Sequence, residues 1–393
     1  MPHVDKDRPA PEWISEMRRK FTTERAIDEA MTRKLERRSG PAYTPLTLDA
    51  IVDGLRNLIA SHTDEKFQIK SARWLSGGAS KLQVAFTLEK GPTQQRMVVR
   101  LEPAESLHET SRLREFEMVR ALQGTIPIPG VYWVDHDACY LPYPGLVYEF
   151  SPGVTKPSNA ASGVSGLGTR MPPEFRKPLG EQFVRDLARL HTFDFRKADL
   201  PSFDVPALGK QNSVWAVGWW DRVWEEDSDE QIPLVSLTRA WLRQNAPSVD
   251  HLSVVHGDFR VGNFLFDEGD RRITAWLDWE LTRIGDRHQD LAWSTSRAFG
   301  SFAEDGSTFL VSGLVPEDKF FESYEKASGL SVNMNSLRYY QVFNAYSMAA
   351  MTLATSYRVA RNGKSHQDVL LTWLLGVGYM ILDDIRQLIE KEL

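Results

Sequence analysis

The chain of 393 residues carries 47 Lys and Arg against 53 Asp and Glu, a formal net charge of −6. With 42% hydrophobic and 25% charged residues it resembles a soluble globular protein of two to three structural units, and the acidic balance argues against a nucleic-acid partner. The single cysteine, Cys139, excludes an intramolecular disulfide and, with no apolar leader at the N-terminus, favours a cytoplasmic location.

Residues 1–43 form a charged extension that we expect to be helical. Its segment Glu12–Arg19 is amphipathic, and Ser39-Gly40-Pro41 ends the helical pattern. The extension would pack on the body of the protein or on a second subunit, so a homo-oligomer is possible. The most apolar run, Leu370–Leu382, is short and bounded by Asp368 and Asp383, which predicts a buried helix and no membrane partner.

Two strands and a glycine turn are predicted after the extension. Phe67–Leu75 and Lys81–Leu88 have strand character, and a turn at residues 76–80 joins them. Paired glycines let a backbone approach phosphates closely, and free N–H groups in such a turn attract anions, although an ordinary hairpin turn is the simpler alternative. The candidate phosphate-binding residues are Gly77, Gly78, Ala79 and Ser80.

A third strand, a helix and a fourth strand follow. Met97–Leu101 carries Arg100, a side chain that can bind phosphate bidentately. Leu113–Leu122 has helical composition and carries Glu115, which could equally be a solvated helix charge. Gly145–Phe150 is an apolar strand that ends at a Ser-Pro-Gly turn.

Beyond this point the pattern becomes mainly helical. From Thr155 to Pro173 the composition shifts to Gly, Ser, Ala and Pro, which fits either a lid over an active site or a disordered surface insertion. The predicted helix Asn212–Trp224 carries tryptophans at i, i+4, i+5 and i+9. Such spacing usually means core packing, and an aromatic wall of a substrate pocket is the second possibility.

The chemistry-bearing residues lie between Leu252 and Glu280. His256-Gly257-Asp258 follows a β-branched run, Asn263 comes five residues after Asp258, and Asp278 ends a second apolar run. This spacing is typical of phosphoryl transfer, in which a base orients a hydroxyl and hard oxygen ligands hold Mg²⁺ around a nucleotide triphosphate. We therefore predict Asp258 as the catalytic base and Asn263 and Asp278 as metal ligands.

These residues also carry a family resemblance. His256 to Asn263, together with Leu277-Asp278-Trp279-Glu280, Gly285-Asp286 and Asp290-Leu291-Ala292, resembles the aminoglycoside phosphotransferase superfamily of small-molecule kinases. The variant with Asp-Trp-Glu-Leu before Gly-Asp looks closest to the branch found fused to acyl-CoA dehydrogenase-like proteins. In such families Asp286 and Asp290 are mainly structural.

The resemblance implies an α+β, two-lobed protein-kinase-like fold: an N-lobe with an antiparallel sheet plus a helix, and a mainly helical C-lobe. Its units would be a helical extension (1–43), a nucleotide-binding lobe and hinge (44–150), and a catalytic and substrate-binding lobe (151–393). Arg100, where many relatives have Lys, would hold ATP phosphates and pair with Glu115, which fits the pattern better than Glu117. Glu149 and Phe150 would lie near the adenine.

The sequence does not identify the acceptor substrate. An acidic run from Glu225 to Glu230 could attract a polycationic aminoglycoside, whereas Arg338, Arg358 and Arg361 could hold a carboxylate or an acyl-CoA phosphate. The expected activity is ATP- and Mg²⁺-dependent phosphorylation of a hydroxyl group on an aminoglycoside or a hydroxylated metabolite. The alternative is a catalytically silent nucleotide- or partner-binding protein.

Overall fold

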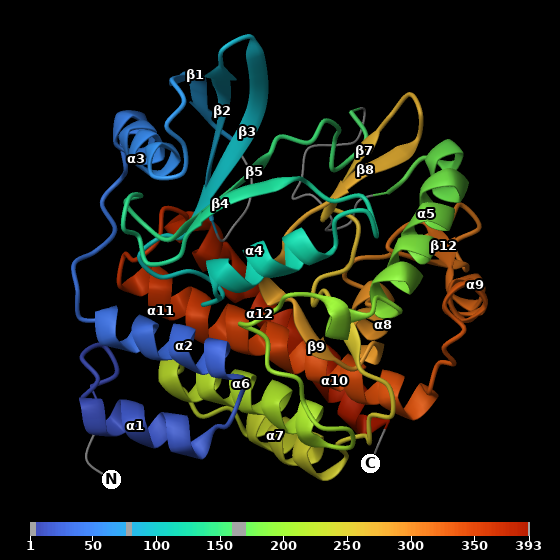
Figure 1. The fold of residues 1–393 in the computed structure, drawn as a ribbon. Coiled ribbons are helices and arrows are strands. Elements are labelled where there is room, and N and C mark those ends of the chain that lie inside the picture. Colours follow the sequence, from blue (N-terminus) through green and yellow to red (C-terminus); the bar gives the residue numbers. More distant parts are fainter. Residues whose placement is uncertain (1–4, 76–80, 159–169, 392–393) are drawn as a thin grey trace.

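The computed structural model describes residues 5–75, 81–158 and 170–391. Figure 1 shows a twisted sheet with two helices above a larger, mainly helical part. Each part has its own hydrophobic core: the smaller is built around Ile51, Val84 and Val99, and the larger around Phe183, Phe259 and Trp276. Asp258, Asn263 and Asp278, predicted from the sequence, lie on loops of the larger part, next to Phe259, Phe264 and Trp279 of its core.

The upper lobe contains one five-stranded antiparallel sheet in the order β1-β2-β3-β5-β4. Its elements are α3 (Leu48–Ala60), β1 (Phe67–Trp74), β2 (Leu82–Lys90), β3 (Thr93–Leu101), α4 (Arg112–Ala121), β4 (Val131–Asp135) and β5 (Gly145–Glu149). In the central strand β3 every residue from Met97 to Leu101 is buried. Arg100 is therefore placed on a rigid strand that is covered by packing on both faces.

Helix α3 is an addition to the predicted lobe, which had one helix beside its sheet. Thr47 caps it by accepting a hydrogen bond from the Ala50 N–H at 3.2 Å, and Ile51, Leu55 and Ile59 are fully buried against the sheet. Since these apolar residues recur at i, i+4 and i+8 after a Thr cap, the helix could have been predicted from the sequence.

The lower lobe is mainly helical. Its helices are α5 (Pro173–His191), α6 (Gln211–Asp227), α7 (Pro233–Gln244), α8 (His288–Ser294), α9 (Glu317–Ser328), α10 (Met334–Ala349), α11 (Ser356–Arg361) and α12 (Asp368–Glu390). Its strands are β6 (Ser253–Val255), β7 (Phe264–Asp267), β8 (Arg272–Trp276), β9 (Arg283–Gly285), β10 (Ser301–Phe302), β11 (Phe309–Val311) and β12 (Val315–Pro316). Strand β6 pairs with β9, and β7 pairs with β8, so the two short ladders bracket the catalytic loop.

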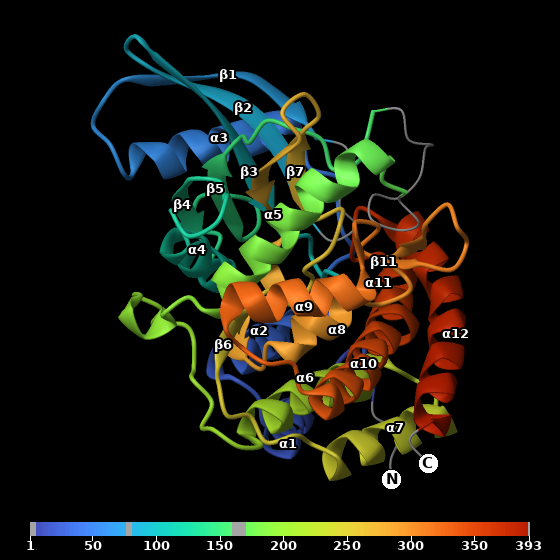
Figure 2. The same ribbon diagram turned by 90° about the vertical axis from the view of Figure 1, so that its right-hand side faces the viewer.

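Helix α12 differs from the buried helix that its composition predicts. Leu371, Ile381 and Ile385 are buried, but Trp373 is 50% exposed and Met380 is 70% exposed. The helix runs along the outside of the lobe (Figure 2), so only one face contacts the core. No helix in the described ranges is both long and apolar enough to cross a bilayer.

The N-terminal extension packs on the lower lobe. Helices α1 (Pro11–Lys20) and α2 (Arg25–Arg37) lie beside α6 and α7 (Figure 1). Lys34 and Arg38 both donate to the buried carboxylate of Asp227, at 2.6 and 2.5 Å. A Cβ at Gly218 would lie 2.1 Å from the Thr22 carbonyl oxygen, so only glycine permits this close approach. Buried ion pairs thus attach the extension to α6.

Candidate functional site

The loop between β6 and β7, which carries the predicted base Asp258 and is called the catalytic loop for that reason, is held by His256. The Asp258 N–H donates to His256 Nδ1 at 3.1 Å, and His256 Nε2 lies 3.0 Å from the Leu277 carbonyl oxygen. These contacts require the tautomer with a proton on Nε2, which donates to Leu277. His256 is fully buried, so it connects the backbone beside Asp258 to the residue that precedes Asp278.

Asp290 and Gly257 fix the backbone of the same loop. The Asp290 carboxylate accepts from the His256 N–H at 2.7 Å and the Gly257 N–H at 2.8 Å. Gly257 has φ +84°, and a Cβ there would lie 2.8 Å from Leu281 Cβ. His191 Nε2 lies 3.2 Å from Asp290, and burial lowers the pKa of His191. Asp286 and Asp290, which the family resemblance implies are mainly structural, are buried, and so is His191.

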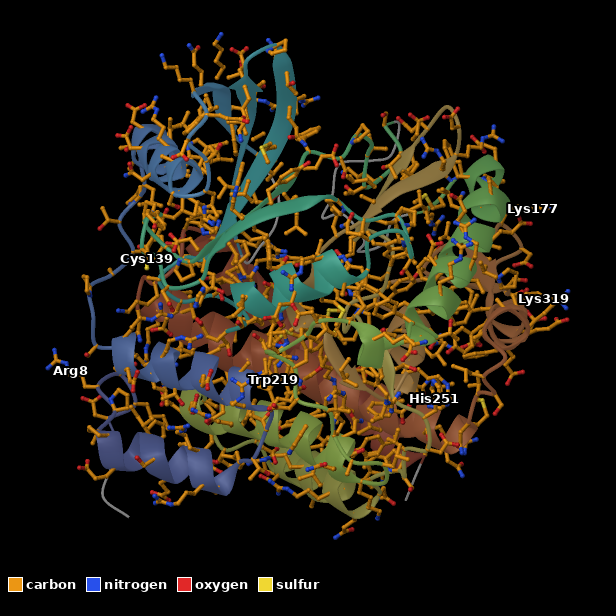
Figure 3. The ribbon with its side chains drawn as sticks, viewed as in Figure 1. Arg8, Cys139, Lys177, Trp219, His251 and Lys319 are labelled. Carbon is orange, nitrogen blue, oxygen red and sulfur yellow. The ribbon has the colours of Figure 1, made fainter. Side chains whose placement is uncertain are left out.

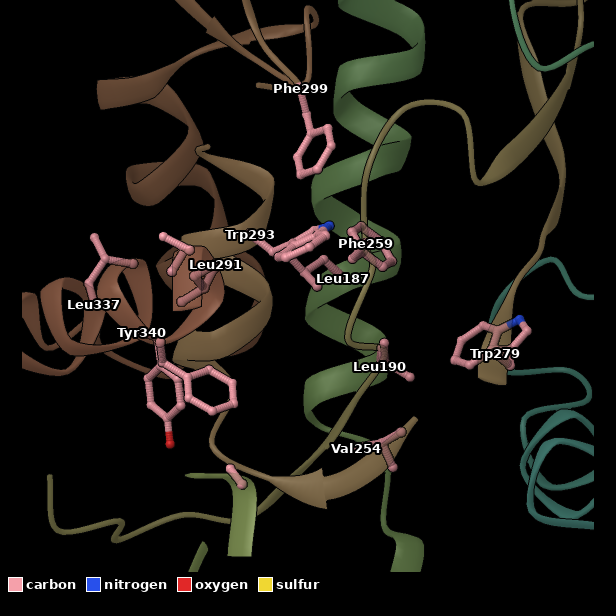
Figure 4. Packing of buried hydrophobic residues seen from close by; sticks show 14 of the residues in the cluster. Leu187, Leu190, Val254, Phe259, Trp279, Leu291, Trp293, Phe299, Leu337 and Tyr340 are labelled. Atoms are coloured by element: carbon pink, nitrogen blue, oxygen red, sulfur yellow. The ribbon is translucent and has the colours of Figure 1, made fainter. Parts of the chain in front are cut away.

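Three donors hold the carboxylate of Asp258. Arg260 Nε donates to Oδ1 at 2.6 Å, Trp293 Nε1 donates to the same oxygen at 2.5 Å, and Asn263 Nδ2 donates to Oδ2 at 2.6 Å. The Asp258 side chain remains 15% exposed. Its direction is therefore fixed while part of the carboxylate stays accessible. Trp293 belongs to a packed aromatic group with Phe259 and Phe299 nearby (Figure 4), which makes it a rigid donor.

Asn263 and Asp278 face one cavity at the lobe junction. Asn263 uses its amide nitrogen on Asp258, which leaves its Oδ1 as a potential ligand. Asp278 has φ +66° and ψ +54°, a left-handed conformation that is rare for a residue with a side chain. Strained backbone of this kind often occurs at functional sites. The Asp278 side chain is 33% exposed.

Arg100 joins the two lobes electrostatically. Its guanidinium donates to Glu115 Oε1 at 2.8 Å and to Asp278 Oδ1, and it lies 3.4 Å from Glu280. Burial alone would lower the pKa of Arg100, but Asp278 and Glu115 outweigh it and raise that pKa well above its ordinary value. The structure places Glu115 against Arg100, whereas Glu117 accepts from Ser202 at 2.8 Å instead.

Further charges complete this cluster, and the sequence did not single them out. Arg112 lies 3.1 Å from Glu280, and Lys81 Nζ lies 3.2 Å from the same carboxylate. Burial acts to raise the pKa of Glu280, yet Lys81, Arg100 and Arg112 hold it well below its ordinary value. The buried face of α4 is thus charged as well as apolar. Hydrophobic periodicity cannot reveal such a face, although the density of charges from Arg112 to Glu117 was a usable signal.

The cavity itself has a volume of about 640 Å³ and lies between the lobes. Arg100 and Glu115 line it from the upper lobe, and Asn263 and Asp278 line it from the lower one. Glu149 and Phe150 border it at the strand that connects the lobes. This volume and mixed lining suit a nucleotide-sized ligand. Gly77, Gly78, Ala79 and Ser80 lie outside the described residues.

The segment from Thr155 onward also reaches this cavity. Residues 155–158 line it, and Ser158 hydrogen-bonds Glu268 through both its N–H and its hydroxyl, at 2.9 and 2.5 Å. Residues 159–169 are not among those described.

Two tryptophans of α6 pack in the core, and their role as the wall of a substrate pocket stays a prediction. Trp219 and Trp220 are 6% and 5% exposed and their rings stack, with centroids 5.2 Å apart. They also line a second, narrow cavity together with Gly257 and Trp293. Core packing and a wall beside the catalytic loop are therefore properties of the same side chains.

The structure does not support the two charge features expected to select the acceptor. Arg358 and Arg361 both pair with Asp7 and with Asp229, so these arginines connect the N-terminal extension to the lower lobe. Asp227, in the acidic run, is buried between Lys34 and Arg38. Long-range ion pairs within the chain thus occupy Asp227 and Asp229 of the acidic run and Arg358 and Arg361 of the basic set, whereas Glu230 is exposed. Arg338 is exposed on α10.

Comparison with solved structures confirms the expected fold. A crystal structure from Ralstonia eutropha JMP134, provisionally assigned as an aminoglycoside phosphotransferase, covers 87% of this chain and 99% of its own, with a TM-score of 0.59 and 21% identity. Choline kinase from Cryptosporidium parvum Iowa II covers 88% of this chain and 97% of its own, with a TM-score of 0.53 and 14% identity. The chain therefore has the two-lobed, protein-kinase-like α+β fold.

Sequence comparison finds the branch that the catalytic segment resembles. Acyl-CoA dehydrogenase family member 10 of Mus musculus is 25% identical over 269 residues, which are 65% of this chain and 24% of the relative. Acyl-CoA dehydrogenase family member 11 of Homo sapiens is 25% identical over 309 residues, 75% of this chain and 37% of the relative. The chain thus spans well under half the length of these curated relatives.

A sequence profile identifies the family itself. The profile described as the phosphotransferase enzyme family, abbreviated APH, matches residues 71–314, more than half of the chain. The matched region includes β2, β3, α4, the catalytic loop and the segment with Asp278, which are the parts that meet at the large cavity. The chain belongs to the APH phosphotransferase enzyme family.

Proposed function

We propose that this chain is an ATP-dependent phosphotransferase that transfers the γ-phosphoryl group to a hydroxyl group of a small molecule. One observation carries the proposal. Asp258, held by three donors, lies beside Asn263, which lines the large cavity together with Asp278 and the ion pair of Arg100 and Glu115. A hydroxyl acceptor, a metal-bound triphosphate and a phosphate-binding cation would meet at this position.

The residues present fit Mg²⁺ with a nucleotide. The described residues contain no group of three or more His, Cys, Asp or Glu side chains suited to hold a metal by themselves. Mg²⁺ in kinases needs only one or two protein oxygen ligands, because phosphate oxygens and water complete its shell. Asn263 Oδ1 and the Asp278 carboxylate are such ligands. When bound, the metal neutralises charge on the triphosphate.

The protein groups have separable roles in this proposal. Asp258 orients the acceptor hydroxyl and accepts its proton, while Asn263, Arg260 and Trp293 keep the carboxylate in position. Arg100 is held by Glu115 on one side, and its contact with Asp278 spans the lobe junction. Because phosphoryl transfer leaves little covalent work to the protein, this alignment accounts for most of the expected catalysis.

The adenine would lie at the strand that connects the lobes. The Glu149 N–H donates to the Gly130 carbonyl at 2.7 Å, and the Phe150 N–H donates to the Arg96 carbonyl at 3.0 Å. Those two N–H groups are therefore occupied. The next residue, Ser151, also lines the cavity, and we assign its N–H as the donor to the base.

The acceptor is more consistent with a hydroxylated metabolite than with an aminoglycoside. Two carboxylates of the acidic run that could have attracted a polycation are already paired within the chain, Asp227 with Lys34 and Arg38, and Asp229 with Arg358 and Arg361. An assay of ATP-dependent phosphorylation across a metabolite pool, read by mass spectrometry, would identify the acceptor. A cytoplasmic location remains a prediction.

The decisive variant is Asp258→Asn. It should lower turnover roughly 10²–10⁴-fold, because general-base help is lost, while ATP affinity stays unchanged. Asp270→Asn, at the exposed tip of the hairpin of β7 and β8, is the matched control and should retain full activity. Full activity of Asp258→Asn would refute the role of Asp258. Binding of ATP without transfer to any compound would favour a catalytically silent nucleotide-binding protein.

A further inference from the structure

Arg283, on β9, is a buried cation that lacks a carboxylate partner among the described residues. It is 3% exposed. Its Nε donates to Gln289 Oε1 at 2.9 Å, one terminal nitrogen donates to the same neutral oxygen, and its guanidinium carbon lies 5.8 Å from the centre of the Phe343 ring. The second terminal nitrogen makes no hydrogen bond to any described residue, and it keeps a small exposure to solvent.

This environment differs from that of most buried arginines in the chain. The buried arginines that contact a carboxylate within 4.0 Å are Arg38, Arg100, Arg112, Arg114, Arg222 and Arg358. Arg287 also lacks an ion pair in the described ranges, but it donates to the Ser331 carbonyl at 2.6 Å. Removing a guanidinium from water without an anion is costly, so an unpaired buried arginine is expected to have a compensating ligand.

The position of Arg283 points to the acceptor side of the active site. It lines the narrow cavity that Trp219 and Gly257 also line. Trp293, a further wall of this cavity, donates to the carboxylate of Asp258. Gly257, which lines this cavity, immediately precedes the proposed base Asp258 in the chain. Trp219, labelled on the lower lobe in Figure 3, is 6% exposed, so this wall is part of the core and not of an exposed surface.

We propose that Arg283 anchors a carboxylate of the acceptor, which makes the substrate a small hydroxylated carboxylic acid. This inference rests on the proposed function. The planar guanidinium fork matches the two oxygens of a carboxylate, and the neighbouring indole rings of Trp219 and Trp220 suit an apolar carbon chain. A cationic aminoglycoside would instead meet an uncompensated positive charge in a nearly dry site.

The cavity must widen for a ligand to enter. Its volume is about 10 Å³, enough for one water molecule. Met351, which borders it, has a flexible unbranched side chain and lies in the π-helical turn Ala350–Thr355. Such turns are frequent at functional sites, and rotamer changes on binding are common. We therefore expect the Met351 side chain to move when the carboxylate binds.

The test measures binding first, without phosphate transfer. The full chain is titrated with 3-hydroxyhexanoate and with the neutral 3-hydroxyhexanamide, and quenching of tryptophan fluorescence gives both dissociation constants. The acid should bind roughly tenfold or more tightly than the amide, since a charge-assisted hydrogen bond is lost in the amide. Equal affinity, or no binding of the acid, would overturn the proposal.

Variants test whether Arg283 is responsible for the preference for the acid over the amide. Arg283→Gln should abolish the preference for the acid, whereas Arg189→Gln, an exposed arginine on α5, should leave it unchanged. If Arg283→Gln does not fold, Arg283→Lys decides: it keeps a charge but loses the fork, so affinity for the acid should fall at least about fivefold while affinity for the amide stays the same. A preference unaffected by these substitutions would contradict the assignment.

Transfer from ATP to the same two compounds separates this inference from the proposed function. Preferential binding of the acid, with no transfer from ATP to either compound or to any compound of the metabolite pool, would refute phosphotransfer and leave the carboxylate site intact. Equal transfer to both would support the phosphotransferase and refute the anchor at Arg283.

Discussion

Replacement of Arg100 by methionine tests whether one buried cation supports both the lobe junction and nucleotide binding. Arg100 is 5% exposed and contacts three carboxylates: Glu115 at 2.8 Å, Asp278, and Glu280 at 3.4 Å. Methionine preserves most of the side-chain volume and removes the charge. Arg100→Met therefore leaves these three carboxylates with fewer positive neighbours while disturbing the packing little.

The size of the effect follows from the partners that remain. Breaking a buried ion pair typically costs about 3–5 kcal/mol, because a buried charge is left unpaired. In this variant Glu115 and Glu280 both keep Arg112, and Asp278 is 33% exposed and can be hydrated. We therefore expect the free energy of unfolding to fall by an amount near the lower limit, about 3 kcal/mol. ATP affinity should fall roughly tenfold or more, since a charge-assisted phosphate contact is lost.

Urea unfolding and nucleotide titration measure the two effects separately. Lys70→Met is the matched control: the pair of Lys70 and Glu89 is in the same sheet at 2.6 Å, but Lys70 is 53% exposed. The free energy of unfolding of this control should fall by less than about 1 kcal/mol. If Arg100→Met loses no more stability than Lys70→Met and binds ATP normally, the reasoning about the junction is refuted.

Two other predictions concern the support of the catalytic loop. Trp293→Phe removes one donor to Asp258 and should lower kcat roughly tenfold with KM for ATP unchanged, because Asn263 still orients the other oxygen; steady-state kinetics would contradict this if kcat were unaffected. Burial lowers the pKa of His191 from its ordinary value of 6.5, so the unfolded chain binds more protons and stability should fall as the pH drops below that value. Urea unfolding at several pH values should show a shallower decline for His191→Gln, and an identical decline would contradict the assignment.

The order of the catalytic parts could be predicted from the sequence because each part is local. Asp258 and Asp278 each follow a short apolar strand, and strand ends deliver side chains to fixed positions. The periodic segment that became α4 likewise placed Glu115 on a helix after the strand of Arg100. Comparison with the APH family then confirmed the fold that these local patterns imply.

Other features depended on contacts between distant parts of the chain. Asp7 and Arg358 are 351 positions apart, yet their ion pair is the reason that Arg358 is unavailable to a substrate. Periodicity likewise identified Trp219 as a core residue but could not show that the same ring borders a cavity beside Gly257.

Residue type, spacing and hydrophobic period thus determined the kind of chemistry, since they encode local backbone geometry directly. Which charges are paired and which remain free was decided only by the tertiary structure, because pairing depends on burial and on long-range approach. Arg283 illustrates the difference. In the sequence it is one arginine among many, and only the fold shows it buried, near the proposed base and with no carboxylate partner among the residues that the structure describes.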